Sequence, residues 1–315
     1  MQGYYLGIDV GSVSTNLVLT DESSQIVAEL YLRSQGQTMK SVAAGLQELA
    51  QKQGVSEVLG VGVTGSGRKV IGTILGAEAI KNEITAHGLA AVKAEPSVRT
   101  VLEIGGQDSK LILLNRGVIT DFAMNTVCAA GTGSFLDRQA QRLGIGVEEI
   151  GDYAARAENP THIAGRCAVF AESDMIHKQQ QGESRENILG GLCQALVRNY
   201  LANLAKGKKI REPVLFQGGV AANRGILAAF EKELGLTVQV PAHFAVMGAW
   251  GAAILAREAA GALPRPRRLS WEALEQEGRI DTFVCRDCAN HCEIMQNIRD
   301  GQVLGCWGSR CGKYS

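Results

Sequence analysis

Apolar residues occur in short alternating or continuous runs that predict two sets of three strands along the chain. The first set covers residues 4–10, 14–20 and 25–33, and the second covers residues 98–104, 109–115 and 118–124. Runs of this length with alternating apolar and polar positions are typical of strands with one buried face. The pattern therefore indicates one unit of structure that occurs twice.

Helical periodicity, in which apolar residues recur every three or four positions, follows each set of strands. After the first set it predicts a helix over 38–53, a strand over 57–63 and helices between 67 and 93. After the second set it predicts helices over 129–143 and 183–206, then a strand and turn over 213–219. Consecutive strands followed by alternating helices and strands predict a mixed sheet in each of two α/β lobes.

The duplication is visible in the residues themselves. IDVGSVSTNLVL at 8–19 recurs, at a constant offset of 94, within LEIGGQDSKLILL at 102–114. Both segments run from an apolar strand through a glycine turn into a second strand, so each turn is predicted to be the tip of a β-hairpin. The alignment places Asp9 on Glu103, Gly11 on Gly105, Ser12 on Gly106, Ser14 on Asp108 and Thr15 on Ser109.

A glycine turn beside a carboxylate is the chemistry of a metal–nucleotide site. The turn lets backbone N–H groups approach a phosphate, while Asp9 or Glu103 contacts a phosphate only through Mg2+ or a bound water. Each turn alone could be an ordinary hairpin turn, but two copies in register favour the functional interpretation.

A third glycine element, FQGGVAANRGI at 216–226, ends an apolar strand and opens a helix. Gly218 and Gly219 would let the chain pass close to a flat ligand such as adenine or ribose. Asn223 is either a helix cap or a ligand contact.

Composition limits the class of partner. The chain has 315 residues, of which 45% are hydrophobic, and its 32 basic and 32 acidic residues cancel. This balance provides no basic surface for nucleic acid or for a membrane. The start MQGYYLGIDV enters a strand without the basic segment and cleavage site of a signal peptide, so we expect a cytoplasmic protein.

Two cysteines in the second half are candidates for a shared metal centre. Cys128 immediately precedes a glycine-rich helix start, and Cys167 follows 39 residues later in AGRCAVFAESD. A helix N-terminus favours a negatively charged thiolate, and an iron–sulfur cluster needs four of them. Two per chain are half a set, which a two-fold symmetric dimer would complete. On spacing alone, two buried and inert cysteines remain the alternative.

Seven motifs occur in a fixed order: GIDVGSVST, TGSGRK, NEITAH, EIGGQDSK, NTVCAAGTGSFL, GRCAVFAESDMI and FQGGVAANRGI. Over about residues 3–260 they resemble the ATP-dependent activators of 2-hydroxyacyl-CoA dehydratases and benzoyl-CoA reductases. The resemblance implies two ribonuclease H-like lobes of the acetate kinase, sugar kinase, heat-shock ATPase and actin superfamily. It also implies a homodimer bridged by one [4Fe-4S] cluster, with the positions of Cys128 and Cys167 as ligands.

The function implied by this resemblance is ATP-driven transfer of one electron. The activator would receive the electron from ferredoxin or flavodoxin and pass it to an iron–sulfur acceptor enzyme such as a 2-hydroxyacyl-CoA dehydratase. Two alternatives stay open: a small-molecule kinase of the same superfamily without a cluster, and an ATP-dependent reductase of a double-cubane cluster protein or a corrinoid protein.

We assign roles to the motif residues on the expectation that ATP or ADP binds with Mg2+. Asp9 and Asp108 organise Mg2+ and water, Gln107 contacts the attacking water or phosphate, and Ser12, Ser14 and Lys110 contact phosphate. A solvated strand-end charge is the alternative for Lys110. Further nucleotide contacts are expected from the remaining turn residues Gly11, Thr15, Glu103, Gly105, Gly106, Gly131, Thr132, Gly133, Gly218, Gly219 and Asn223.

Three regions are predicted: an N-terminal lobe over 1–94, a second lobe over 95–263 that carries the cluster ligands, and a cysteine-rich tail over 264–315. The Gly- and Ala-rich stretch over 244–260 is expected to be a final core helix, which could pack back on the first lobe. PRPRR at 264–268 is interpreted as a linker.

The tail is dense in cysteine, which in a reducing compartment favours metal over disulfides. Cys-x2-Cys-x3-Cys is followed by Cys-x4-Cys, and the five residues are Cys285, Cys288, Cys292, Cys306 and Cys311. Zn2+ and a second iron–sulfur cluster fit the number of ligands equally well. The tail resembles the segment after the activator domain in longer, multidomain activases, so the chain could be a fragment of one.

Four further residues have simpler interpretations. Glu172 and Asp174 are expected to be solvated acids near a helix start, with cluster tuning as the alternative. His87 in NEITAH is equally consistent with helix packing and with function. Cys193, inside an apolar helix, is expected in the core.

Overall fold

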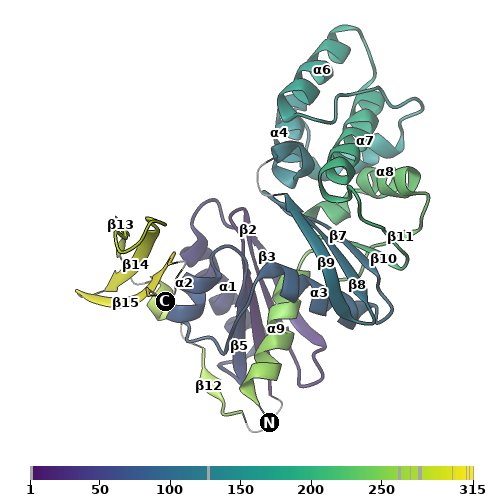
Figure 1. Ribbon diagram of the computed structural model, residues 1–315. Coiled ribbons are helices and arrows are strands. Elements are labelled where there is room, and N and C mark those ends of the chain that lie inside the picture. The colour runs from purple at the N-terminus through teal and green to yellow at the C-terminus, as the bar shows by residue number, and fades with distance from the viewer. Residues whose placement is uncertain are drawn as a thin grey trace. The chain divides into compact units, whose positions relative to one another are not determined.

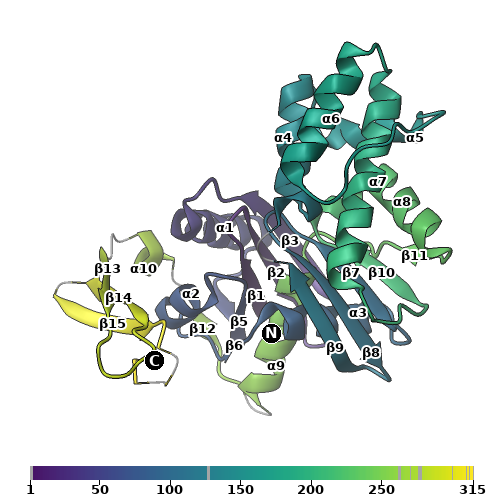
Figure 2. The same ribbon diagram turned by 45° about the horizontal axis from the view of Figure 1, so that its top comes forward.

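The computed structural model describes residues 3–125, 128–261, 264–269, 271–275, 279–299, 301–309, 311 and 313–314. The chain forms two compact units: unit 1 comprises Met1–Ala86 and Gly248–Ser315, and unit 2 comprises His87–Met247. Figures 1 and 2 show a sheet with helices in each unit. None of the helices in the described ranges has the length and hydrophobicity needed to cross a bilayer.

Unit 1 is built on a mixed five-stranded sheet of order β3-β2-β1-β5-β6. β1, β2 and β3 are antiparallel neighbours, whereas β5 and β6 are added in parallel to β1. The strands are β1 (Tyr5–Val10), β2 (Ser14–Thr20), β3 (Ile26–Arg33), β5 (Gly60–Thr64) and β6 (Ala79–Ile80).

Helices cover both faces of this sheet. Leu6 and Ile8 of β1 pack in one core with residues of α1 (Thr38–Gln53) and α2 (Arg68–Ile74). On the opposite face, glycine lets α9 (Met247–Ala260) approach β1, because a Cβ on Gly7 would lie 1.9 Å from the carbonyl oxygen of Ala249. The first strand of the chain is therefore packed directly against α9, which lies more than 200 residues later in the sequence.

Unit 2 repeats the same sheet, with the order β11-β10-β7-β8-β9. Its strands are β7 (Thr100–Ile104), β8 (Ser109–Asn115), β9 (Val118–Asn125), β10 (Val214–Gln217) and β11 (Val238–Gln239). The register repeats as well: Asp9 pairs with Asn16 across β1 and β2, and Glu103 pairs with Lys110 across β7 and β8. The internal duplication inferred from the sequence is therefore matched strand for strand.

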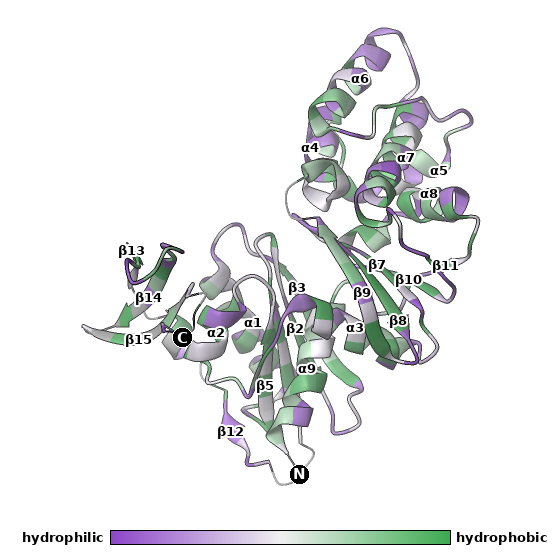
Figure 3. Cartoon of the chain, in the orientation of Figure 1, coloured by the Kyte–Doolittle hydropathy of each residue, from purple (hydrophilic) through white to green (hydrophobic). Residues whose placement is uncertain are grey.

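Helices between β9 and β10, together with α8 after β10, enclose the main core of unit 2. Phe230 stands edge-on to Tyr200 and Phe216, with ring centroids 5.2 and 5.1 Å apart. Figure 3 shows hydrophobic residues concentrated along β8 and also along α9 of unit 1. The helical elements are α3 (Glu83–Ala94), which contains the boundary between the units, η1 (Ala129–Gly131), α4 (Gly133–Leu143), η2 (Val147–Glu149), α5 (Ile150–Ala155), α6 (Ala168–Gln180), α7 (Arg185–Leu204), η3 (Gly219–Ala222) and α8 (Arg224–Leu234).

The tail adds a small antiparallel sheet to unit 1. It consists of β13 (Arg279–Val284), β14 (Glu293–Arg299) and β15 (Gln302–Trp307), preceded by the short helix α10 (Glu272–Glu275). The predicted linker is itself paired: β12 (Arg267–Arg268) lies antiparallel to β4 (Glu57–Val58). The guanidinium of Arg267 also donates to the carbonyl of Leu75 at 2.7 Å, so this segment is anchored to unit 1.

Candidate functional site

Both predicted phosphate turns are hairpin tips closed by the same hydrogen bond. The N–H of Gly11 donates to the carbonyl of Ser14 at 2.9 Å, and the N–H of Gly105 donates to that of Asp108 at 3.0 Å. Ser12 and Gln107 are exposed at the two tips. The hairpin geometry inferred from the alternating pattern is confirmed.

A glycine with φ of +89° follows the neighbouring parallel strand in each unit: Gly65 after β5 and Gly218 after β10. A Cβ on Gly65 would lie 2.6 Å from the Asp9 carboxylate, and a Cβ on Gly218 would lie 2.8 Å from that of Glu103. Only glycine fits so close to the carboxylate and adopts this φ without strain. Gly65 is not among the predicted site residues, although TGSGRK follows a predicted strand as FQGG does.

Asp9 is half-buried and lies between two polar neighbours in the sheet, Asn16 on β2 and Thr64 on β5. Among the residues that the structure describes, neither Asn16 Oδ1 nor Thr64 Oγ1 has a hydrogen-bond partner, although both atoms are buried. Buried polar atoms are normally satisfied, and carboxylate, amide and hydroxyl oxygens are hard donors suited to Mg2+ or its waters. These three residues fit a hydrated Mg2+. Beside them Thr15 is buried, with Oγ1 3.3 Å from Ser34 Oγ, and Ser14 is half-buried at the start of β2.

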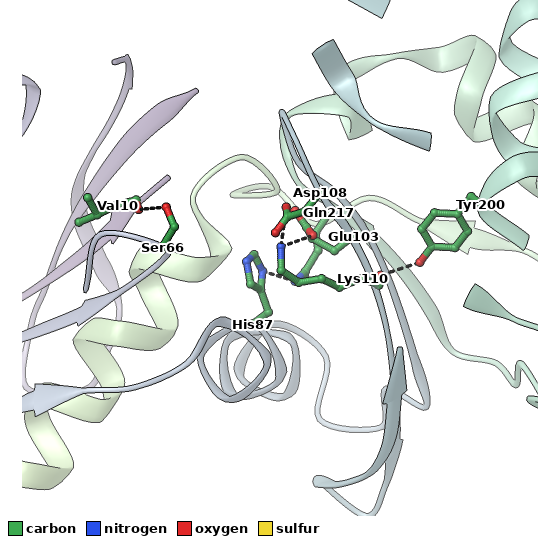
Figure 4. A network of polar contacts seen from close by, with 8 residues as sticks. All are labelled: Val10, Ser66, His87, Glu103, Asp108, Lys110, Tyr200 and Gln217. Carbon is green, nitrogen blue, oxygen red and sulfur yellow. Dashed lines mark hydrogen bonds and ion pairs between the residues drawn. The ribbon is translucent and has the colours of Figure 1, made fainter. Parts of the chain in front are cut away.

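The equivalent place in unit 2 contains an ammonium group. Lys110 replaces Asn16, is 2% exposed, and places Nζ 2.9 Å from Glu103 Oε2 and 2.9 Å from Asp108 Oδ1 (Figure 4). The alternative that Lys110 is a solvated surface charge is wrong. The two predicted carboxylates of this unit are thus held together by a buried lysine.

His87 and Gln217 form a second buried contact next to Lys110 (Figure 4). His87 Nδ1 lies 2.8 Å from Gln217 Nε2, so the ring nitrogen accepts from the amide. Burial first, and then the charge of Lys110, lowers the pKa of His87 to about 3. His87 is therefore neutral at physiological pH and serves packing and positioning rather than charge.

The Lys110 backbone is also fixed, because the Tyr200 hydroxyl donates to its carbonyl at 2.6 Å. Burial first, and then the charge of Glu103, raises the pKa of Tyr200 well above its usual value. The hydroxyl therefore stays protonated and remains a donor to the strand that carries Lys110.

The second hairpin tip is fastened to the start of α4. Gly133 N donates to the carbonyl of Gly105 at 2.9 Å, and Ser134 N donates to that of Gly106 at 2.8 Å. The Ser134 hydroxyl adds a bond to the Gly106 carbonyl at 2.6 Å. The predicted phosphate turn and the helix that follows Cys128 are therefore one hydrogen-bonded assembly.

The remaining glycine-rich positions have structural reasons of their own. A Cβ on Gly131 would lie 2.9 Å from Asn199 Oδ1, and the Thr132 hydroxyl donates to the Ala129 carbonyl at 2.8 Å. Gly219 opens η3, and Asn223 caps α8 by accepting from Ile226 N at 3.1 Å. Their contacts with nucleotide stay predictions, while the capping role of Asn223 is established.

The two candidate cluster ligands are half-buried thiols at the N-termini of helical segments. Cys128 directly precedes η1, and Cys167 directly precedes α6. The α6 helix contacts η1. Two free cysteine sulfurs at the N-termini of helical segments fit one half of a four-cysteine site.

The two acidic residues after Cys167, Glu172 and Asp174, make ion pairs or hydrogen bonds within unit 2, so their interpretation as solvated acids is wrong. Glu172 lies 2.9 Å from Arg142 and 3.1 Å from Arg138, both on α4, and accepts from Gln139 at 3.3 Å. Burial acts to raise the pKa of Glu172, but the Gln139 hydrogen bond and the arginine charges outweigh it and lower the pKa. Asp174 accepts from Ala164 N at 2.8 Å and so fixes the loop before Cys167.

Cys193 is 1% exposed in the core, as predicted, and burial raises its pKa to about 12. In the tail, Cys285 N donates to the carbonyl of Cys292 at 2.8 Å, and Cys306 lies on β15. Within the described ranges all eight cysteines are free, and no three His, Cys, Asp or Glu side chains form a metal-binding group. Tail metal binding by Cys285, Cys288, Cys292, Cys306 and Cys311 stays a prediction.

A family model and a curated relative both show similarity of this chain to one family of ATPases. Residues 6–256 match the model of the BadF/BadG/BcrA/BcrD ATPase family. The (R)-2-hydroxyglutaryl-CoA dehydratase activating ATPase of Acidaminococcus fermentans is 34% identical over 261 residues, which are 81% of this chain and 98% of that protein.

Solved structures show the same similarity to dehydratase activators. The activator of the 2-hydroxyisocaproyl-CoA dehydratase from Clostridium difficile, with bound ADPNP, has a TM-score of 0.77 at 32% identity, over 82% of this chain and 95% of that one. A ROK family glucokinase from Streptomyces griseus has a TM-score of 0.52 at 14% identity, over 81% of this chain and all of that one, and shares the fold alone. The predicted fold class and the resemblance to the activators are confirmed.

Proposed function

The chain belongs to the BadF/BadG/BcrA/BcrD ATPase family, and from this we propose that it couples ATP hydrolysis to the transfer of one electron. The similar activators are named for the 2-hydroxyacyl-CoA dehydratases on which they act. The proposed acceptor is accordingly an iron–sulfur enzyme of that kind, and the proposed donor is ferredoxin or flavodoxin.

One observation carries the coupling: the hairpin tip at Gly105 and Gly106 is bonded to Gly133 and Ser134, which follow Cys128 in the same segment. A phosphate bound at the tip would change the position of its backbone amides. Because the tip carbonyls accept from α4, that change would reach the start of α4 and the Cys128 thiol within a few residues.

The residues of this chain divide the nucleotide chemistry between them. Asp9, with Asn16 and Thr64, would hold a hydrated Mg2+. Lys110 holds Glu103 and Asp108 in place, and Gln107 at the exposed tip would contact the attacking water or the phosphate. The N–H groups of Gly11 and Gly105 close the two hairpins, so other backbone amides of these turns, such as that of Gly106, would approach the phosphates.

Cys128 and Cys167 are the proposed ligands of a [4Fe-4S] cluster shared with a second copy of the chain. Such a cluster supplies one-electron redox chemistry when bound. The first turn of α6 supports the dimer, because Val169 and Phe170 are 69% and 65% exposed immediately beside Cys167. An apolar pair of this kind would be covered by the second subunit.

The energy scale is consistent with this coupling. For one electron, 59 mV corresponds to about 1.4 kcal/mol, so raising an electron by a few hundred millivolts costs roughly 5–10 kcal/mol. Hydrolysis of a nucleotide can supply energy on this scale, which explains why an electron-transfer protein would carry an ATPase fold.

The test separates the nucleotide site from the cluster. We expect protein purified without oxygen to be a brown dimer with about four irons per dimer from the shared centre. Cys128→Ser should lose this iron and keep MgATP binding, while Asp9→Ala should lose magnesium-dependent hydrolysis and keep the iron. Cys193→Ala is the matched control, since this thiol is buried in the core, and it should keep both properties.

A colourless protein that phosphorylates a small molecule would identify a kinase and contradict the proposal. A brown protein that reduces a double-cubane or corrinoid protein, and does not activate a dehydratase, would retain the electron transfer and change the acceptor. Iron or zinc beyond the shared centre that disappears in Cys285→Ser would belong to the tail.

A further inference from the structure

Asn199 on α7 contacts both cysteine-bearing segments of unit 2. Its side-chain amide Nδ2 lies 2.6 Å from the carbonyl of Gly165, two residues before Cys167, and 3.8 Å from the Sγ of Cys128. The residue is 3% exposed and is 71 positions from Cys128 in the sequence. One buried amide therefore connects two segments that are far from Asn199 in the sequence.

The orientation of this amide is fixed by a neighbour. Asn203, one turn further along α7, donates from Nδ2 to Asn199 Oδ1 at 3.0 Å. With its oxygen accepting there, Asn199 presents its N–H groups to the Gly165 carbonyl and the Cys128 sulfur. An amide has two such hydrogens, so both contacts can be made at once. The Cys128 sulfur also lies 3.9 Å from Asn199 Oδ1, to which a thiol can donate, whereas a cluster-bound thiolate has no proton and can only accept from Nδ2.

The Cys128 side of this contact is equally constrained. Asn125 accepts from Cys128 N at 2.9 Å and donates to the Cys128 carbonyl at 2.8 Å. Gly131 lies against the same amides, because a Cβ there would be 2.9 Å from Asn199 Oδ1. The backbone that positions the sulfur is therefore held by two asparagines, and Asn199 also reaches the loop before Cys167.

We propose that Asn199 is a positioning residue that sets the spacing of the two thiols and donates an N–H hydrogen bond to the Cys128 sulfur. The inference rests on the proposed function, since the chemical role assigned to the sulfur is that of a cluster ligand. Hydrogen bonds to ligand sulfurs stabilise the more negative, reduced state and so raise the reduction potential. Asn199, to which no nucleotide contact is assigned, thus adjusts how easily the protein accepts an electron.

The experiment uses Asn199→Leu, which has no donor, and Asn199→Asp, which keeps the oxygen that accepts from Asn203. The matched control is Asn187→Leu on the same helix, which removes one side-chain hydrogen bond, accepted from Asn159 N at 3.0 Å. Redox titrations of the intact dimer, followed by electron paramagnetic resonance, give the potential of each protein. Amide hydrogen exchange on iron-free protein gives the protection of residues 125–131 and 160–168.

Both Asn199 variants should lower the ratio of reduced to oxidised centre at a fixed solution potential by about tenfold, which is ~59 mV for one electron. Both segments should also lose protection together in the iron-free protein, whereas Asn187→Leu should change exchange only near residue 159 and leave the potential unaltered. If Asn199→Leu does not fold, Asn199→Asp decides. Wild-type potential and wild-type exchange in the folded variants would overturn the inference.

Failure of the proposed function and failure of the role inferred for Asn199 would give different results. If the wild-type protein binds no iron, the proposed function fails, and the exchange experiment still shows whether Asn199 ties the two segments together. If the wild type holds the centre and the variants match it in both measurements, only the role of Asn199 is refuted.

Discussion

Replacing Lys110 by methionine tests whether the buried ion pairs hold unit 2 together. The substitution keeps most of the apolar stem and removes the ammonium that lies 2.9 Å from both Glu103 and Asp108. The Glu103 side chain is 4% exposed, so its charge would be left buried without this partner. The Asp108 side chain is 28% exposed and can regain water.

The expected loss follows from these burial values. Removing one partner of a buried pair typically costs 3–5 kcal/mol, because the remaining charge is uncompensated. We expect about 3 kcal/mol, at the low end of that range, since Asp108 remains partly solvated. With a urea dependence of about 2 kcal/mol per M, the unfolding midpoint of unit 2 should fall by about 1.5 M.

The two units can be followed separately in urea. All three tryptophans, Trp250, Trp271 and Trp307, belong to unit 1, so their fluorescence reports on that unit. Circular dichroism reports on the helices of both units. Lys110→Met should move the dichroism transition to lower urea and leave the fluorescence transition near its wild-type midpoint, provided the units unfold independently.

Two companion variants make the result decisive. Lys110→Met with Glu103→Gln removes the buried charge and should recover at least half of the lost stability. Lys52→Met is the control, because its pair with Glu48 is exposed and is worth less than about 0.5 kcal/mol. A Lys110→Met midpoint within the range of this control would refute the reasoning.

Three further predictions concern residues around the site. Between pH 7.5 and 5, the free energy of unfolding measured in urea should fall by about 2 kcal/mol more for the wild type than for His87→Gln. Only the unfolded wild-type chain protonates this histidine as the pH falls below 6.5. Parallel losses in the two proteins would contradict the buried neutral ring. Glu172→Gln should lower stability by roughly 0.5–1 kcal/mol and raise hydrogen exchange at the start of α6, and unchanged exchange would show that its two arginines on α4 do not hold α6. Gly218→Ala should lower the free energy of unfolding in urea by at least ~2 kcal/mol more than Gly207→Ala. Both glycines have positive φ, but of the two only Gly218 would place a new Cβ 2.4 Å from a carbonyl oxygen, that of Ile104. Equal losses would leave φ as the sole cause.

Local patterns in the sequence were sufficient for the longer strands and the hairpin tips, whereas the two-residue edge strands β6 and β11 were not predicted. Alternation over 8–19 and 102–114 predicts both turns because the side-chain period of a strand is two, and the structure repeats their register at the same offset of 94. The ion pair of Lys110 with Glu103 could also have been predicted from the sequence. Once Gly105–Asp108 is a hairpin tip, Glu103 and Lys110 are opposite each other on one face.

Other features had a weaker signal or none. A helix start was expected near Glu172, but the extent of α6 was not predicted, because its first turn carries the exposed apolar residues Val169 and Phe170, which blur its helical pattern. The tail sheet was not predicted, because the cysteine spacing of this segment indicates metal ligands and not strands. Asn199 could not be found from the sequence, because its partners Gly165 and Cys128 are 34 and 71 positions away.

The packing of α9 on β1 has a consequence for synthesis on the ribosome. Unit 2 is continuous from His87 to Met247, whereas unit 1 needs Gly248 and the residues after it to cover the face that carries Gly7. At about 5–20 residues per second, translation takes roughly 10–30 s to proceed from the end of the first segment to α9. During that time the nascent N-terminal sheet is left with an open apolar face while the middle of the polypeptide can already be folded. The half that emerges first is completed last, which makes it the part that a chaperone would have to protect.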